Sequence, residues 1–193
     1  MPELWTIGHS NHPVEYFLDM LTAHHITAVA DVRSNPYSIV AAQFNREEIQ
    51  DALRKRRIYY VYLGEELGPR SPDPACYENK RVVYARLAAT PAFAKGIERL
   101  KKGMQLHRIA LLCSEKDPIL CHRMVLICRY LSRDPGLSIH HILEDGSIEE
   151  HAASEHRLMD KFRISEYDLF HTREEQVSKA YELQEADIAY SMA

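Results

Sequence analysis

The densest group of chemically capable side chains lies between Cys113 and Arg123. Cys113 ends an apolar run, and Cys121 and His122 precede an apolar stretch where a helix is expected to begin. Unpaired N–H groups at a helix start bind anions and lower the pKa of a nearby thiol. We therefore predict that Cys113 is a nucleophilic or redox-active thiol. His122 and Glu115 are predicted to act as acid or base, and Cys121 and Arg123 to bind an anionic group.

Two more groups of polar side chains follow apolar runs near the N-terminus. His9 and Ser10 follow the first run, and Asp31, Arg33 and Ser34 follow the second. We predict that His9 and Asp31 join the acid–base set, because imidazole and carboxylate groups are common proton carriers in enzymes. Arg33 is predicted to hold an anion, with the hydroxyls of Ser10 and Ser34 beside it.

Each of these groups also has a purely structural interpretation. A free cysteine is most often a small buried hydrophobic residue, and this is the alternative for Cys113. Asp31 and Arg33 are two residues apart and point to the same face of a strand, where an ion pair would only stabilise the edge. Capping of the first helix is the alternative for His9.

The cysteine spacing is typical neither of a metal site nor of a disulfide scaffold. A zinc site built from Cys113, Cys121, His122 and His9 would lack the Cys-x-x-Cys or His-x-x-x-His spacing of paired ligands. We therefore predict no metal site. A disulfide between Cys113 and Cys121 would require the intervening loop to fold back. Cys128 lies in an apolar helix pattern and is predicted to be a core residue.

Apolar runs and helical patterns alternate along the chain, and this order determines where the polar groups lie. It predicts an α/β fold with a mainly parallel sheet and helices on both faces, a Rossmann-like three-layer arrangement. Ligands bind at the carboxyl ends of the strands in such sheets, so the three polar groups are expected on one rim. Strands are predicted at residues 4–7, 26–32, 58–63, 108–113 and 138–143, and helices at 14–21, 45–56, 77–87, 91–102 and 124–131.

The domain organisation is predicted to be simple. Residues 1–150 are expected to form a single α/β domain, and 151–193 a helical C-terminal extension that packs on it or trails from it. Residues 64–74, which include Gly68–Pro69, are predicted to be a long loop. Loops of this length are usually functional or mobile.

The composition excludes several classes of protein. The 193 residues are 46% hydrophobic and 27% charged, as in ordinary globular domains, and the net charge of −4 argues against proteins that coat nucleic acid. No apolar run is long enough for a membrane span, and no secretory signal is evident, so a cytoplasmic location is expected. Phosphate-loop, dinucleotide-binding and nucleophile-elbow motifs are absent from the sequence.

The polar groups also belong to a series of motifs that covers roughly residues 4–150. In chain order, these motifs are residues 6–10, 31–34, 36, 38, 44, 58–60, 63–64, 67–68, 111–115, 117–118 and 121–123. On these motifs the chain resembles the family of domains of unknown function numbered 488. The resemblance implies an α/β domain and implies no particular activity. Pro69 and Arg70 stand where the family pattern often has a second glycine, which changes the expected shape of that loop.

Three kinds of function are compatible with these residues. The first is an enzyme that acts on a small anionic or nucleotide-like substrate through a cysteine thiol and arginine anion clamps. The second is a nucleotide-binding or nucleic-acid-binding sensor module that does no chemistry. The third is an interaction protein whose polar rim is covered by a partner. The sequence leaves the substrate, any cofactor and the oligomeric state open.

Overall fold

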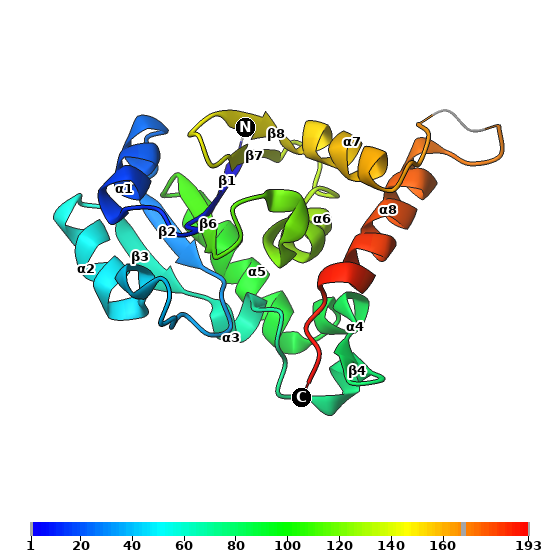
Figure 1. Ribbon diagram of the computed structural model, residues 1–193, viewed down its shortest axis with the longest axis horizontal. Coiled ribbons are helices and arrows are strands. Elements are labelled where there is room, and N and C mark those ends of the chain that lie inside the picture. The colour runs from blue at the N-terminus through cyan, green and yellow to red at the C-terminus, as the bar shows by residue number, and fades with distance from the viewer. Residues whose placement is uncertain (1, 167–168, 193) are drawn as a thin grey trace.

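The computed structural model describes residues 2–166 and 169–192. Six strands form one sheet in the order β3-β2-β6-β1-β7-β8 (Figure 1). Five strands are parallel and β8 is antiparallel to β7, which confirms the predicted α/β fold with a mainly parallel sheet. The strands are β1 (Glu3–Gly8), β2 (Ala28–Asp31), β3 (Tyr59–Tyr62), β6 (Ile109–Cys113), β7 (Ser138–Ile142) and β8 (Ile148–Glu150).

Helices cover both faces of the sheet because its central strands are apolar throughout. All five residues of β6 are buried, and they alternate between two hydrophobic clusters. Ala110 and Leu112 pack with α1 (Val14–Ala23) and α2 (Arg46–Lys55), whereas Cys113 lies in the cluster on the opposite face. That second cluster is completed by α4 (Tyr84–Ala88), α5 (Pro91–Met104), α7 (His151–Lys161) and α8 (Arg173–Ile188).

The C-terminal helices contribute to the same core as the sheet. Leu158 of α7 and Tyr181 of α8 are buried in the cluster that contains Cys113. Thr172 and Glu175 form a capping box that fixes the start of α8. Residues of the C-terminal extension thus pack on the α/β domain, while a boundary at residue 150 stays a prediction.

The predicted helix over 77–87 is wrong in its first half. Residues 77–82 form a hairpin of β4 (Tyr77–Glu78) and β5 (Arg81–Val82), and only α4 follows as a helix. Asn79 and Lys80 adopt positive φ angles of 48° and 66°, which ends any helix there and makes the turn. The apolar spacing of this segment reflects a hairpin followed by a short helix.

Two further predictions need correction. The predicted helix over 124–131 begins as a π-helix, η4 (Arg123–Cys128), and continues as α6 (Arg129–Leu131). All six residues of η4 are buried. The sequence therefore shows no alternation of apolar and polar residues from which a π-helix could be distinguished from an α-helix. The sixth strand of the sheet, β8, is missing from the strands predicted from the sequence. The short helices are η1 (Ala42–Phe44), α3 (Gly64–Leu67), η2 (Pro74–Cys76) and η3 (Pro118–Leu120), and α3 occupies the start of the predicted 64–74 loop.

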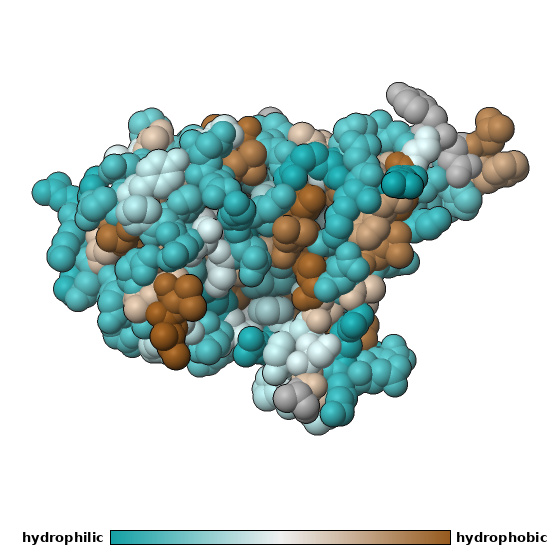
Figure 2. Space-filling model, viewed as in Figure 1, coloured by the Kyte–Doolittle hydropathy of each residue, from teal (hydrophilic) through white to brown (hydrophobic). Residues whose placement is uncertain are grey.

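The face of the molecule shown in Figure 2 is mostly hydrophilic, with apolar side chains gathered in separate small patches. Ile39 and Val40, in the segment between β2 and α2, are among the most exposed apolar side chains. Within the described residues, no helix has the length and hydropathy needed to cross a bilayer.

Candidate functional site

The three predicted polar groups lie along one rim of the sheet. β6 lies between β1 and β2, and Gly8 pairs in register with Cys113. Beyond the strands, the main-chain N–H of His9 donates to the Cys113 carbonyl at 2.9 Å, and that of Ser10 donates to the Ser114 carbonyl at 2.9 Å. The chain segments that follow β1 and β6 are therefore joined directly at this rim.

The sheet divides the rim into two clusters of side chains. Asp31 shares its face with Val29, which packs on the α1–α2 side, whereas Cys113 belongs to the opposite side. Val32, the next residue after Asp31, belongs to the same side as Cys113. The side chains of residues 31 and 32 thus belong to clusters on opposite faces of the sheet. The order of the motifs along the sequence does not predict this separation.

On the α1–α2 side, Asp31 and Arg33 form a buried two-point ion pair. Nε of Arg33 donates to Oδ1 of Asp31 at 2.9 Å, and Nη2 donates to Oδ2 at 2.6 Å. Asp31 is fully buried and Arg33 is 5% exposed. Tyr60 donates its hydroxyl to Oδ2 of Asp31 at 2.8 Å. The guanidinium predicted to hold an anion is therefore already neutralised by a carboxylate of the protein.

His9 completes this cluster as a neutral imidazole. Nη1 of Arg33 donates to Nε2 of His9 at 3.1 Å, so Nδ1 carries the proton and donates to the Ser10 carbonyl at 2.7 Å. Burial and the charge of Arg33 lower the pKa of His9 to about 4. Its ring also stacks on Phe44, with centroids 4.4 Å apart. Both nitrogens are occupied, so this geometry makes His9 a positioning group for Arg33.

Tyr60 is a member of this cluster that the sequence did not identify. Tyr60 pairs in register with Val29 of β2. Val29 lies two residues before Asp31, so the two side chains point to the same face of the sheet. Diagonal neighbours in a sheet are within reach of a tyrosine side chain. The alternation of β3 together with a parallel β2–β3 pairing would have predicted the contact.

On the opposite side, two thiols and one imidazole form a buried triangle. Sγ of Cys113 lies 3.5 Å from Nδ1 of His122, and Sγ of Cys121 lies 3.8 Å from the same nitrogen. All three ligand atoms lie within 4.8 Å of one another, and the three residues are buried. Cys113 and Cys121 are both free cysteines. The loop between them therefore does fold back, without forming a disulfide.

The orientation of His122 is set by the main chain. Nε2 of His122 lies 3.0 Å from the carbonyl oxygen of Val32. A carbonyl only accepts, so Nε2 carries the proton and donates it. In the neutral ring Nδ1 is then the unprotonated nitrogen, and its lone pair faces the sulfurs of Cys113 and Cys121.

The surroundings of the two sulfurs differ. The main-chain N–H of Arg123 donates to Sγ of Cys121 at 3.5 Å. Although burial acts to raise it, the pKa of Cys121 is held well below its ordinary value by hydrogen bonding to Cys113 and by the charge of Arg123. The hydrogen bond to Cys121, together with burial, raises the pKa of Cys113. Of the two thiols, Cys121 is therefore the one that gives up its proton more readily.

Arg123 is fully buried beneath this triangle. Its guanidinium donates to the carbonyls of Glu115 and Lys116 and, at 3.3 Å, to the hydroxyl of Thr6. Within residues 2–166 and 169–192 it forms no ion pair with a carboxylate, so the sulfur of Cys121 is the neighbouring group able to balance its charge. Arg123 was predicted to bind an anionic ligand, and with no exposed surface it instead organises the loop and the thiols.

Gly8 makes this loop geometry possible. A Cβ at this position would lie 1.8 Å from the carbonyl oxygen of Glu115, the same oxygen that accepts from Arg123. The side chain of Glu115 is exposed, so this residue contributes its main-chain carbonyl to the cluster. Ser10 and Ser34 are partly exposed, and Oγ of Ser34 accepts the main-chain N–H of Arg70 at 3.0 Å.

A buried chain of hydrogen bonds runs from Arg123 into the molecule. Thr6 bonds to His141 at 2.8 Å, His141 to His151 at 3.0 Å, and His151 to Tyr181 at 3.2 Å. Burial lowers the pKa of His141, and it lowers that of His151 to about 4. No local pattern in the sequence predicts these hydrogen bonds, because the residues come from β1, β7, α7 and α8.

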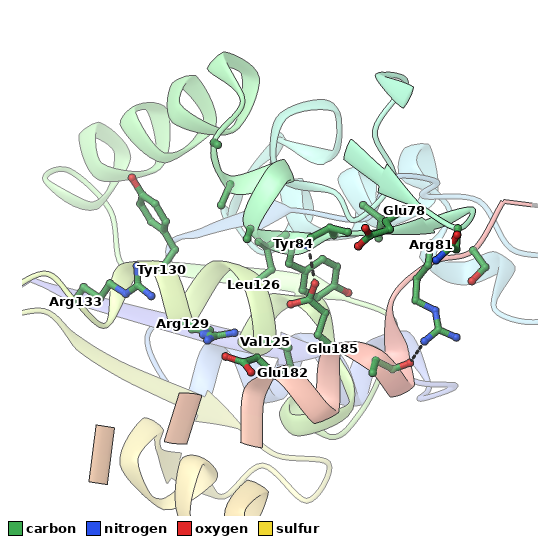
Figure 3. Close-up of a pocket in the computed structure, with 18 residues that line it drawn as sticks. Glu78, Arg81, Tyr84, Val125, Leu126, Arg129, Tyr130, Arg133, Glu182 and Glu185 are labelled. Atoms are coloured by element: carbon green, nitrogen blue, oxygen red, sulfur yellow. Dashed lines mark hydrogen bonds between the residues drawn. The ribbon is translucent and has the colours of Figure 1, made fainter. Parts of the chain in front are cut away.

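A cavity of about 910 Å³ lies among the β4–β5 hairpin, α4, the η4–α6 helix and α8 (Figure 3). None of the site residues predicted from the sequence lines it. Tyr84 lies at its wall, with its main-chain N–H donating to Glu185 at 2.7 Å. Burial and the neighbouring Cys121 raise the pKa of Tyr84.

Comparison with known proteins gives a family and no activity. A family model described as "Domain of unknown function DUF488" matches residues 13–130, more than half of the chain. The match includes β2, β6 and the thiol triangle and begins after β1. No curated protein and no solved structure matches the chain.

Proposed function

We propose that this chain, which belongs to the DUF488 family, is an enzyme that acts on a small anionic or nucleotide-like substrate through Cys121 and His122. The observation that carries the proposal is the pairing of two thiols with one oriented imidazole. Nδ1 of His122 faces both sulfurs while its Nε2 is held by the Val32 carbonyl. A nucleophile beside a base that a third group orients is the arrangement typical of nucleophilic catalysis.

In the proposed step, Cys121 is the nucleophile and His122 carries the proton. The thiol proton of Cys121 passes to Nδ1 of His122 as the sulfur bonds to the electrophilic atom of the substrate. The leaving group departs with the electron pair of its bond and takes that proton from the imidazolium. Cys121 is favoured over Cys113, the nucleophile predicted from the sequence, because the N–H and the buried charge of Arg123 stabilise an anionic sulfur.

The substrate is proposed to bind over the rim formed by β1, β2 and β6. Ser10, Ser34 and Lys116 are partly or fully exposed there and supply hydrogen-bond donors. Ligands of open α/β sheets bind at this edge. A reducing compartment such as the cytoplasm would keep both thiols free for the reaction.

A ligand screen followed by a turnover assay tests the proposal. The full chain is screened by thermal denaturation against phosphorylated metabolites, nucleotides and other small anions, and each stabilising compound is incubated and analysed for products by mass spectrometry. We expect turnover that Cys121→Ser abolishes, that His122→Asn impairs and that Cys76→Ala, a buried cysteine outside the triangle, leaves unchanged. Stabilisation without turnover, unaffected by Cys121→Ser, would instead support a binding module. If no compound stabilises the chain, the proposed substrate class is wrong.

A further inference from the structure

We propose that Cys113, Cys121 and His122 bind a thiophilic divalent cation such as Zn²⁺ through their two Sγ atoms and Nδ1. The proposal goes beyond the function proposed above, because the ligand set is present whether or not Cys121 reacts with a substrate. It also departs from the expectation of no metal site, which was based on spacing along the chain. The ligands come from the end of β6 and from the two residues before η4, so their proximity depends on the fold.

The distances between the ligand atoms fit a single tetrahedral cation. Zn–S bonds of about 2.3 Å and Zn–N bonds of about 2.0 Å place sulfur and nitrogen about 3.5 Å apart at a tetrahedral angle. The observed distances from Nδ1 of His122 are 3.5 Å to Cys113 and 3.8 Å to Cys121. A cation can therefore enter with little movement of the three side chains.

The surrounding hydrogen bonds also suit a metal ligand set. Histidine ligands usually donate their second nitrogen to a carboxylate or a main-chain carbonyl, which fixes the tautomer that binds the metal. His122 does this through Val32. The N–H donated by Arg123 to Cys121 stabilises the thiolate form that a cation requires.

The loop that carries Cys121 and His122 is held in place before any cation binds. Asp117 accepts the main-chain N–H of Ile119 at 3.2 Å and a two-point ion pair from Arg157 at 2.9 and 3.1 Å. Arg123 holds the preceding turn through the Glu115 and Lys116 carbonyls. A site fixed in this way loses little conformational entropy on binding.

The set leaves one coordination position for a ligand from outside the chain. Among the described residues, no further His, Cys, Asp or Glu joins the three. His9, the fourth ligand in the zinc alternative, has both nitrogens bonded elsewhere. Two thiolates balance the charge of a divalent cation, so the buried charge of Arg123 remains and favours an anion such as hydroxide at the open position.

Binding of Co²⁺, whose visible spectrum reports its ligands, tests the site. The full chain is treated with a chelator, kept reduced with a phosphine and titrated with Co²⁺. We expect one equivalent to bind, with the ligand-field bands of tetrahedral cobalt and a thiolate charge-transfer band, and Zn²⁺ to displace it. Changing a residue that only hydrogen-bonds to a metal ligand lowers metal affinity by up to about a hundredfold. Cys113→Ser and His122→Asn change the ligands themselves, so each should weaken Co²⁺ binding by more than this. Cys76→Ala and Cys128→Ala are the matched controls and should bind Co²⁺ as the wild type does.

A second measurement on the wild-type chain guards against variants that fail to fold. Zn²⁺ should slow the labelling of Cys113 and Cys121 by iodoacetamide far more than that of Cys76 and Cys128, which react only when the chain unfolds. The absence of charge-transfer bands and of this protection would overturn the proposal, as would cobalt spectra that the triangle variants leave unchanged. The two proposals fail separately. If the chain binds cobalt but the metal-free chain shows no turnover, the metal site is supported and the proposed enzyme activity is wrong. If the chain shows turnover but binds no cobalt, the enzyme activity is supported and the metal site is wrong.

Discussion

Nε2 of His122 donates to the main-chain carbonyl of Val32 across 3.0 Å, and this one contact aims Nδ1 at both thiols. The two residues are far apart in the sequence: Val32 directly follows β2, and His122 directly precedes η4. Val32 belongs to the same side of the sheet as Cys113. The orientation of the imidazole is thus a property of the sheet order, in which β2 and β6 are neighbours.

The Asp31–Arg33 pair is expected to be a major contributor to stability. Asp31→Asn removes the negative charge and leaves the buried guanidinium without its counter-ion, which should lower the free energy of unfolding by about 3–5 kcal/mol. Tyr60→Phe removes one hydrogen bond to the same carboxylate and should cost about 1 kcal/mol. Urea denaturation measures both. An Asp31→Asn chain as stable as the wild type would show that the pair is not held as described.

Arg123 is expected to act as a structural cation. Arg123→Met should lower the free energy of unfolding by about 1–3 kcal/mol for each of the two carbonyls, Glu115 and Lys116, that lose a charged donor. Arg133→Met, on the exposed surface after α6, is the matched control and should leave the urea midpoint unchanged. Equal urea midpoints for Arg123→Met and Arg133→Met would contradict the structural role assigned to Arg123.

Gly8 should not tolerate a side chain. Gly8→Ala places a Cβ 1.8 Å from the Glu115 carbonyl oxygen, so the loop that holds Arg123 must move. In Gly103→Ala, the control, the nearest contact is the flexible end of Ile109 at 2.8 Å, and alanine favours the helix. Thermal denaturation should show a lower midpoint for Gly8→Ala and little loss for Gly103→Ala. A Gly8→Ala chain with an unchanged midpoint would contradict the close approach.

The buried histidines predict a loss of stability in acid. The folded-state pKa values of His9 and His151 are about 4, below the unfolded value of about 6.5. Between these values the unfolded chain binds more protons than the folded one. The free energy of unfolding should therefore fall as the pH drops from about 6.5 to 4, by up to about 3 kcal/mol for each histidine.

Variants separate this effect from general acid denaturation. In urea denaturation at several pH values, His151→Gln should flatten the dependence on pH. His156→Gln, which replaces an exposed histidine on the same helix, should leave it unchanged. If the free energy of unfolding depends on pH equally steeply in both variants, His151 does not titrate as described.

The sequence predicted the fold class and the rim from simple physical signals. Apolar runs alternating with helical patterns are enough to predict a parallel sheet, and the strand-end rule then places His9, Asp31 and Cys113 at one edge. The hairpin over 77–82 was missed because the left-handed turn at Asn79 and Lys80 has no distinctive glycine.

The arrangement within the rim could not be predicted in the same way. Whether Arg33 and Arg123 are free to bind an anion depends on burial and on partners from distant segments. Arg33 is bonded to Asp31 two residues away, and this alternative was visible in the sequence. The partners of Arg123, including Thr6, depend on the packing of β1 against the loop after β6, for which the sequence carries no local signal.

Mapped alkylation of the native, metal-free chain tests the central claim, that Cys121 is activated by His122, most directly. Full-length protein is treated with a chelator, exposed to iodoacetamide at neutral pH and digested, and the rate at each cysteine is read by mass spectrometry. We predict that Cys121 reacts first, that Cys76 and Cys128 react only at the rate of unfolding, and that His122→Asn slows labelling of Cys121 about a hundredfold. Labelling of all four cysteines at one common slow rate, or a Cys121 rate that His122→Asn leaves unchanged, would contradict the claim.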